Sequence, residues 1–427
     1  MLGISLPSQF EYRNGVLHVE GVSALKIARE CGTPVYVYST TAIAERFAGL
    51  EAGLSEVDHL ICYALKANSN QSILKLLNGL GAGFDAVSGG EYARAIAAGA
   101  PGQKIVFSGV GKTESEMRSA LEGGIRQFNV ESEPELLLLN GLAASMDAKA
   151  PVAIRINPDI DAETHQKIST GMAENKFGVP IRRARHIYSR AAELPNIDIV
   201  GIDVHIGSQL QNLEPFRKAF SLIAELAAEL RADGHAIKRI DLGGGLGIAY
   251  NSREETPICP EDYCEAIIET VGHLGCEIEI EPGRYIVGDA GILLSNVLYL
   301  KDGADRRFLV VDAAMNDLMR PAIYDAYHEI IPVSEPGPDQ SPLSVDVVGP
   351  VCESSDTFAK QRLLPAIGAG DTVAFLSAGS YGSSMASEYN TRALVPEVLV
   401  NGEKYAVIRK RPTIKEIIDR DIVPAWL

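Results

Sequence analysis

The chain has 427 residues, of which 46% are hydrophobic and 22% charged, and its net charge is −17. This composition is typical of a globular enzyme, and the length suits about two or three domains. The acidic balance argues against nucleic acid or an anionic membrane as a partner, because both need a basic face.

Neither a membrane span nor a secretory signal is predicted. No apolar stretch reaches the length of about 18 residues that a membrane helix needs, and residues 1–10 contain no cationic region before an apolar core. The cysteines are too scattered for a disulfide framework and lack zinc-ligand spacing. We therefore expect a cytoplasmic protein with no metal site and with reduced thiols at Cys31, Cys62, Cys259, Cys264, Cys276 and Cys352.

The first predicted element is a hairpin, because Asn14-Gly15 is a turn pair. From about residue 60 to 281, short β-branched runs then alternate with amphipathic or Ala/Leu-rich helical stretches, which favours parallel strands in an α/β fold. Eight such repeats fit a (β/α)8 TIM barrel better than an open sheet, although an open sheet stays an alternative. The predicted strands are 60–64, 83–86, 104–107, 127–130, 152–156, 199–204, 238–242 and 277–281.

Nearly every predicted strand ends in a polar residue or a glycine. Since chemistry in a TIM barrel sits on the loops after the strands, this rim is the predicted active site. Its residues include Lys66, Asp85, Ser108, Asn129, Glu131, Arg155, His205, Ser208, Gly243, Gly244, Gly245, Glu281 and Arg284.

Lys66 follows the first predicted barrel strand, within YALKAN at 63–68. Burying an ammonium is costly unless it is paired or neutralised, so a lysine at the end of a buried strand points to a function. Such a lysine can form a Schiff base with an aldehyde cofactor or a carbonyl substrate. The alternative is a surface lysine at a strand end.

Two further motifs suit a phosphorylated aromatic cofactor. The glycines in DLGGGLG at 241–247 would let backbone N–H groups approach a phosphate, the alternative being a loop that needs positive φ. In EPGR at 281–284, Glu281 could hold a pyridine nitrogen protonated, and Arg284 could pair with a phosphate or a carboxylate. A structural ion pair between Glu281 and Arg284 is the alternative.

The sixth strand ends in HIGSQ at 205–209. The His205 imidazole could stack on an aromatic ring and Ser208 could donate to a phosphate, although a lone histidine is more often structural. A metal role for His205 is disfavoured, because no second histidine or cysteine stands at ligand spacing.

The C-terminal third carries short β-rich runs at 293–300, 308–311, 344–348, 372–376 and 397–400. We predict a mostly antiparallel β-domain made of residues 1–34 and 286–427 beside a barrel domain of residues 35–285. Its polar motifs are Arg320 with Tyr324, Cys352-Glu353, and GSYG at 379–382. An acidic and a basic group together suit a substrate bearing an ammonium and a carboxylate, whereas an isolated cysteine is usually a small buried hydrophobe.

These motifs occur in one order along the chain, together with FDAVSGGE at 84–91, NKFG at 175–178 and GPVCES at 349–354. In this order the chain resembles, from about residue 10 to 420, the fold-type III pyridoxal-phosphate decarboxylases, and within them most closely the diaminopimelate decarboxylase branch. The resemblance implies decarboxylation of meso-2,6-diaminopimelate to L-lysine and CO₂, the last step of lysine synthesis, with pyridoxal 5′-phosphate as cofactor.

The resemblance also implies residue roles. Lys66 would carry the cofactor, His205 would stack on its ring, Glu281 would pair with its ring nitrogen, and Cys352 would protonate Cα after CO₂ leaves. Further cofactor contacts would come from Asp85, Arg155, Ser208, Gly243, Gly244, Gly245, Gly283, Arg284 and Tyr381. The substrate would be held by Arg284, Arg320, Tyr324, Glu353 and Tyr381. Cys352 and Glu353 would reach the site of a neighbouring subunit, which implies a homodimer with shared active sites.

The substrate assignment depends on Arg320 and Glu353. The far end of meso-diaminopimelate is itself an amino acid, so its carboxylate suits Arg320 and its ammonium suits Glu353. Ornithine would leave a buried arginine unpaired, which is costly. A decarboxylase acting on ornithine, arginine or carboxynorspermidine remains the alternative, and an inactive regulatory homologue is a further one.

Overall fold

The computed structural model describes residues 6–161, 170–171, 175–337 and 341–427. The first five residues, part of the segment in which no secretory signal is expected, lie outside the described residues. The chain divides into two compact units. One contains residues up to Ile43, Ala249–Glu255 and Val287–Leu427, and the other contains Ala44–Ile248 and Thr256–Ile286. The predicted domain limits stay a prediction.

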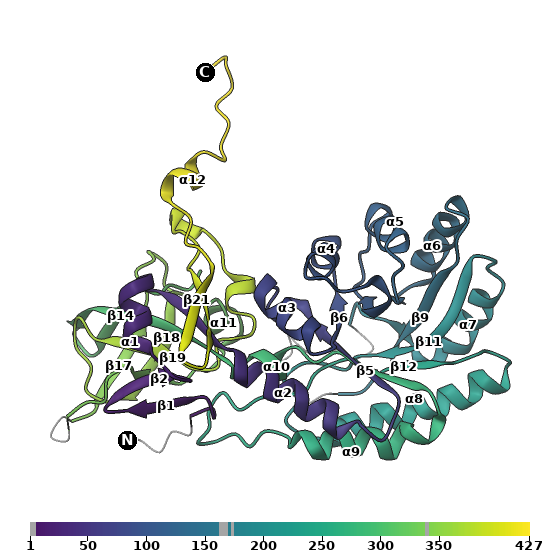
Figure 1. Ribbon diagram of the computed structural model, residues 1–427, viewed down its shortest axis with the longest axis horizontal. Coiled ribbons are helices and arrows are strands. Elements are labelled where there is room, and N and C mark those ends of the chain that lie inside the picture. The colour runs from purple at the N-terminus through teal and green to yellow at the C-terminus, as the bar shows by residue number, and fades with distance from the viewer. Residues whose placement is uncertain (1–5, 162–169, 172–174, 338–340) are drawn as a thin grey trace. The chain divides into compact units, whose positions relative to one another are not determined.

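The second unit is a closed barrel of eight parallel strands, which confirms the predicted TIM-barrel fold and excludes the open sheet (Figure 1). The ring closes because β8 pairs with β9 and β13 pairs with β5. A two-residue strand, β10 (Val179–Pro180), adds to β9 outside the ring. In ring order the strands are β5 (His59–Ala64), β6 (Gly83–Ala86), β7 (Ile105–Phe107), β8 (Gln127–Val130), β9 (Ala150–Asn157), β11 (Ile197–Val204), β12 (Arg239–Asp241) and β13 (Glu277–Ile280).

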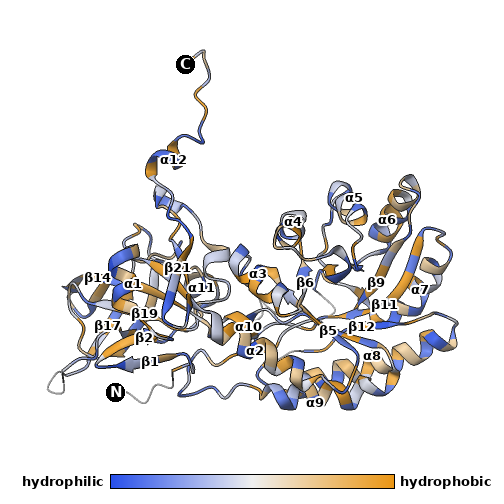
Figure 2. Ribbon diagram, in the orientation of Figure 1, coloured by the Kyte–Doolittle hydropathy of each residue, from blue (hydrophilic) through white to orange (hydrophobic). Residues whose placement is uncertain are grey.

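Helices separate the barrel strands, as the alternating pattern predicts. Thr113 and Ser132 cap α5 and α6, because their side chains accept hydrogen bonds from backbone N–H groups in the first turns of these helices. The long helices α8 and α9 carry both apolar and polar residues (Figure 2) and pack against each other. The helices of this part are α2 (Thr40–Gly53), α3 (Gln71–Gly79), α4 (Gly89–Ala97), α5 (Glu114–Glu122), α6 (Glu133–Ser145), α7 (Ala184–Ala192), α8 (Glu214–Ala232), α9 (Pro260–Val271) and α10 (Arg284–Val287).

The first unit is built on a mixed sheet whose long central strand, β14, pairs with β4, β15 and β19. Most pairings are antiparallel, as predicted, but β15–β17 and β20–β4 are parallel. Its strands are β1 (Phe10–Arg13), β2 (Val16–Val19), β3 (Val22–Ser23), β4 (Val35–Ser39), β14 (Gly291–Asp302), β15 (Arg307–Val311), β16 (Ile330–Pro332), β17 (Leu343–Val348), β18 (Thr357–Leu364), β19 (Thr372–Phe375), β20 (Glu397–Asn401) and β21 (Lys404–Arg409). Its helices are α1 (Ala24–Cys31), α11 (Arg320–Tyr324) and α12 (Ile414–Ile418).

The N-terminal hairpin forms as predicted, with Asn14 and Gly15 both at positive φ between β1 and β2. Its apolar side chains enter one core with residues of β14, β19 and β20, including Leu17, Val19 and Leu294. The N-terminal segment therefore belongs with the C-terminal third, as the sequence indicated. None of the helices in the described part of the chain is long and apolar enough to cross a membrane.

Candidate active site

Lys66 lies in a single 3-10 turn (Leu65–Ala67) that directly follows β5. Its Nζ is 3.1 Å from Oδ2 of Asp85, the second-last residue of β6. The Asp85 side chain is fully buried, whereas 37% of the Lys66 side chain is exposed. The sequence reasoning treated Lys66 as a buried cation, but the amine is paired and accessible, as a nucleophile that must meet a ligand has to be.

Glu281 follows β13 and is buried at the centre of a hydrogen-bonded group. Its Oε1 accepts from Ser108 Oγ at 3.2 Å and from Asn129 Nδ2 at 3.3 Å. Asn129 Nδ2 also donates to Asp241 Oδ2 at 3.0 Å, and the Gly243 N–H donates to Asp241 Oδ1 at 3.0 Å. Residues at the ends of β7, β8, β12 and β13 thereby form one network that fixes the Glu281 carboxylate.

Three buried carboxyl groups, Asp203, Asp241 and Glu281, approach one another, with an oxygen of each within 4.8 Å of the others. Burial, followed by mutual repulsion, raises the pKa of each well above its usual value. Lys66 and Arg155 oppose the rise in the Glu281 pKa. A cation would relieve this repulsion, and the proton on a pyridine ring nitrogen is such a charge.

His205 follows β11 and presents a neutral ring. Its Nδ1 accepts a hydrogen bond from the Gly244 N–H at 3.1 Å, so the ring proton resides on Nε2. Burial, assisted by the positive charges of Arg155 and Lys66, lowers the pKa of His205 well below its usual value. A flat, uncharged imidazole suits stacking on an aromatic cofactor.

The glycine run after β12 is required by close packing. A Cβ on Gly244 would lie 2.3 Å from the Glu281 carbonyl oxygen, and one on Gly243 would lie 2.6 Å from the Val204 carbonyl oxygen. Gly243 and Gly245 also have positive φ angles of 64° and 113°. The loop is thus tightly packed against the ends of the neighbouring strands, where only glycine can be accommodated.

Ser208 and Arg284 meet at the same rim. Arg284 Nη2 donates to Ser208 Oγ at 3.1 Å, and Arg284 is buried. A Cβ on Gly283 would contact Ala67 and Ala64 at 3.0 and 3.1 Å. A buried guanidinium and a hydroxyl side by side are the groups that bind a phosphate oxygen.

Arg155 in β9 is held by two acidic residues, Glu131 and Asp203, of which only Asp203 was absent from the predicted rim. Its Nη1 is 3.0 Å from Glu131 Oε1, and its Nε is 3.9 Å from Asp203 Oδ2. Its guanidinium also stacks on the Phe177 ring at 5.0 Å. The sequence analysis placed Glu131 on the predicted rim but gave it no role. Asp203 could have been noticed in the sequence because it is an acidic residue inside the otherwise mostly apolar strand β11.

The predicted site residues of the first unit form their own groups. Arg320, at the start of α11, is buried, and Tyr381 has a positive φ of 55°, which is rare for a bulky residue. Cys352 is exposed, with its Sγ donating to Asn390 Oδ1 at 3.5 Å. Cys352 is therefore not the buried hydrophobe of the alternative interpretation.

Glu353 lies next to Cys352 and is exposed in the single chain. Hydrogen bonds from Ser355 and then Tyr389 lower the pKa of Glu353 below its usual value, so this carboxylate is charged at neutral pH. Tyr324, at the end of α11, is partly buried. The anionic Glu353 and the buried Arg320 therefore belong to the same unit, and their substrate roles stay a prediction.

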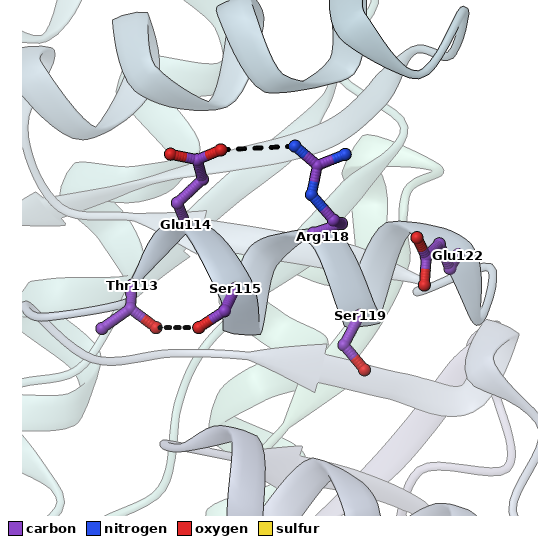
Figure 3. A pocket seen from close by; sticks show the side chains of 6 residues that line it. All are labelled: Thr113, Glu114, Ser115, Arg118, Ser119 and Glu122. Atoms are coloured by element: carbon purple, nitrogen blue, oxygen red, sulfur yellow. Dashed lines mark hydrogen bonds and ion pairs between the residues drawn. The ribbon is translucent and has the colours of Figure 1, made fainter.

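A hollow on the outer face of α5 is unrelated to the strand-end site (Figure 3). Its polar side chains satisfy one another: Thr113 bonds to Ser115 at 3.2 Å, and Arg118 bonds to Glu114 at 3.3 Å. All six lining residues belong to one helix and its cap, and the hollow suggests no chemistry.

A closed eight-stranded barrel with a lysine, buried acids and a glycine loop at its strand ends is consistent with the class of pyridoxal-dependent decarboxylases, to which the chain belongs. The family model described as the pyridoxal binding domain of these enzymes matches residues 40–288.

Within this class, the chain belongs to the diaminopimelate decarboxylases. It is 48% identical over 408 residues to the diaminopimelate decarboxylase of Pseudomonas aeruginosa, covering 96% of this chain and 97% of that protein. The crystal structure of the Helicobacter pylori diaminopimelate decarboxylase complexed with L-lysine is 43% identical, with a TM-score of 0.89, over 93% of this chain and 98% of that one. The M. jannaschii enzyme in co-complex with L-lysine is 37% identical, with a TM-score of 0.94, over 98% of this chain and 99% of that one.

Proposed function

We propose that this chain decarboxylates meso-2,6-diaminopimelate to L-lysine and CO₂, the final step of lysine biosynthesis, with pyridoxal 5′-phosphate as cofactor. The observation that carries the proposal is the strand-end group of Lys66, Asp85 and Glu281 in a chain of this family. Bound pyridoxal phosphate supplies an electron sink for the electron pair that is freed when the Cα–carboxylate bond breaks.

The barrel residues would hold the cofactor as follows. Lys66 provides the amine that joins the aldehyde, and Asp85, at 3.1 Å, orients that amine. Glu281 accepts the ring N–H, because its repulsion by Asp241 makes a positive charge there favourable. The neutral His205 ring covers one face of the cofactor.

The phosphate would bind where side chains are absent and donors gather. Ser208 and Arg284 would supply side-chain donors, and the glycines at 243–245 would border the phosphate, although the Gly243 and Gly244 N–H groups themselves donate to Asp241 and His205. Gly283 lies beside them, packed against Ala64 and Ala67. Arg155, fixed by Glu131, would support the cofactor. Tyr381 would add a further phosphate contact.

The substrate end of the site would come from Arg284, Arg320, Tyr324, Glu353 and Tyr381. Arg320 would bind the distal carboxylate and Glu353 the distal ammonium, while the Cys352 thiol would deliver the proton to Cα after CO₂ leaves. The lowered pKa of Glu353 supports its role as an anion.

We propose further that the enzyme is a cytoplasmic homodimer in which Cys352 and Glu353 serve the neighbouring subunit. Both residues are exposed in the single chain, although a proton donor to a carbon centre needs shelter from water. The end of the chain beyond β21 carries exposed apolar side chains, with Ile422 91% and Trp426 82% exposed, as a surface that another subunit covers would have.

The substrate assignment is tested with purified holoenzyme and a panel of amino acids. We expect CO₂ and L-lysine from meso-diaminopimelate, and no product from L-ornithine, L-arginine or carboxynorspermidine. Turnover of one of the other three instead would leave the cofactor chemistry standing but refute the roles of Arg320 and Glu353. Cofactor binding without turnover of any substrate would indicate the inactive homologue.

A further inference from the structure

The guanidinium of Arg320 is held by a histidine that the sequence analysis did not single out. Arg320 Nη1 lies 2.9 Å from His328 Nε2, and His328 Nδ1 lies 2.8 Å from the carbonyl oxygen of Leu376. His328 is 1% exposed and Arg320 is 6% exposed. The three residues thus form a buried chain from backbone to guanidinium.

This chain fixes the form of the histidine ring. The Leu376 carbonyl can only accept, so His328 Nδ1 must carry a proton. Arg320 can only donate, so His328 Nε2 must present its lone pair. The two contacts together select the neutral tautomer, in which each ring nitrogen is matched to its partner.

Tyr250 fixes the plane of the same guanidinium. The Arg320 Cζ lies 4.2 Å from the centre of the Tyr250 ring, and the Tyr250 ring meets the His328 ring edge-on at 5.3 Å. Stacking on a ring face and a hydrogen bond at the edge leave a planar fork little freedom to turn.

The segment that carries Tyr250 is itself anchored. Residues Ala249–Glu255 group with the first unit although they lie between barrel elements in the sequence. Arg253 pairs with Glu329 at 3.2 Å, next to His328, and Glu255 accepts the Tyr250 N–H at 2.8 Å. The segments that carry Tyr250 and His328 are therefore both anchored, which holds the two side chains in place against Arg320.

Both partners are uncharged, so they orient the guanidinium without supplying a negative charge to it. We propose that His328, with Tyr250, is a positioning residue that aims Arg320 at the distal carboxylate of the substrate. By this means the pair sets the preference for a diamino acid over a plain diamine. This inference rests on the proposed function, because it assigns the carboxylate end of that same substrate.

The test compares two ligands that differ by one carboxylate. L-lysine has the carboxylate that Arg320 would bind, and pentane-1,5-diamine lacks it. Calorimetric affinities of holoenzyme for both are measured in wild type, His328→Phe and His328→Gln, together with KM and kcat for meso-diaminopimelate. The glutamine amide can both donate to a carbonyl and accept from a guanidinium, so it is the conservative replacement.

We expect His328→Phe to weaken lysine binding by roughly ten- to a hundredfold, the scale of one hydrogen bond to a charged group. Diamine binding should change less than about twofold, since no carboxylate is involved. KM for meso-diaminopimelate should rise more than kcat falls, and His328→Gln should recover most of the lysine affinity. Tyr250→Leu should repeat the loss and Tyr250→Phe, which keeps the ring, should not.

Equal losses for lysine and the diamine would overturn the proposal, as would unchanged lysine binding in His328→Phe. If His328→Phe does not fold, the lysine and diamine affinities of Tyr250→Leu and Tyr250→Phe are compared instead, and equal losses for both ligands in Tyr250→Leu would overturn the proposal. A wild-type enzyme that fails to decarboxylate meso-diaminopimelate would overturn the proposed function as well, whereas normal turnover with an unchanged lysine-to-diamine ratio in the variants would overturn this inference alone.

Discussion

Charge is the dominant force among the individual residues of the barrel site. Asp203, Asp241 and Glu281 are buried together. The positive charges of Arg155 and Lys66 oppose the rise in the pKa of Glu281, Arg155 opposes it at Asp203, and hydrogen bonds from Asn129 and Gly243 oppose it at Asp241. Burying like charges is unfavourable unless a proton or a cation joins them. The site is therefore less stable without its cofactor than with it. A cofactor with a protonated ring nitrogen binds more tightly because its positive charge relieves the repulsion among the three carboxyl groups.

Replacing Asp241 by asparagine should remove the destabilisation that the ionised Asp241 carboxylate causes in the folded, cofactor-free protein. The pKa of Asp241 is raised in the folded chain, so the wild type loses stability as pH rises from about 4 through the folded-state pKa, while an amide has no proton to lose. Between about pH 5 and pH 8, the difference in unfolding free energy should move in favour of the variant by on the order of 1 kcal/mol. Urea unfolding at both pH values measures it.

Asp262→Asn is the matched control, because Asp262 is exposed on α9. It should leave the pH dependence of stability unchanged. Parallel pH profiles for wild type and Asp241→Asn would contradict the repulsion argument.

Elements place these residues by a simple rule: the chemistry is at the carboxyl ends of the barrel strands. Asp85 is the second-last residue of β6, Asp241 ends β12 and Glu281 follows β13, so parallel strands of the barrel deliver these side chains to one rim. The glycine run after β12 is part of the same rule, since a Cβ on Gly244 would collide with the Glu281 carbonyl. The strand ends therefore place both the acids and the closely packed glycine loop beside them.

The repeating pattern explains why so much of the barrel could be predicted. Each strand is a short buried apolar run bounded by a turn and a helix, and all eight were found from that signal alone. Residues that act through a neighbour were harder to find. Asp203 looks like a chance acid inside β11, and it becomes informative only once β9 brings Arg155 beside it.

The unit that contains the mixed sheet shows more clearly what sequence patterns cannot predict. β4, within the segment that the sequence assigned to the barrel, pairs with β14 and β20, which are more than 250 residues away. Such long-range pairing leaves no local pattern. Likewise His328 stands eight residues after Arg320, beyond the helix that carries Arg320, and nothing in that spacing predicts their contact.

At the scale of the whole molecule, the proposed sharing of sites has a direct genetic test. Lys66→Ala and Cys352→Ala should each abolish activity, because each removes a reacting group. If Cys352 serves the neighbouring subunit, a mixed dimer of the two variants contains one intact site. Co-expression at equal levels should then restore about a quarter of wild-type activity, because half of the dimers are mixed and each has one working site of two.

The opposite result is equally clear. If Cys352 acts on its own subunit, every site in every mixed dimer lacks one group, and co-expression restores nothing. Sedimentation of the mixture confirms that dimers are present. Absence of recovery in a dimeric mixture would refute shared sites while leaving the decarboxylase assignment intact.

The central claim is that Lys66 is the residue that carries the cofactor, and mass spectrometry after borohydride reduction tests it most directly. Reduction makes the lysine–cofactor bond permanent, so the modified peptide can be identified after digestion. The account predicts one pyridoxyl-phosphate group per chain, on the peptide containing Lys66, and none in Lys66→Ala; the exposed Lys75→Ala should be labelled like wild type. A label on any other lysine, or no label on a chain that binds the cofactor, would contradict it.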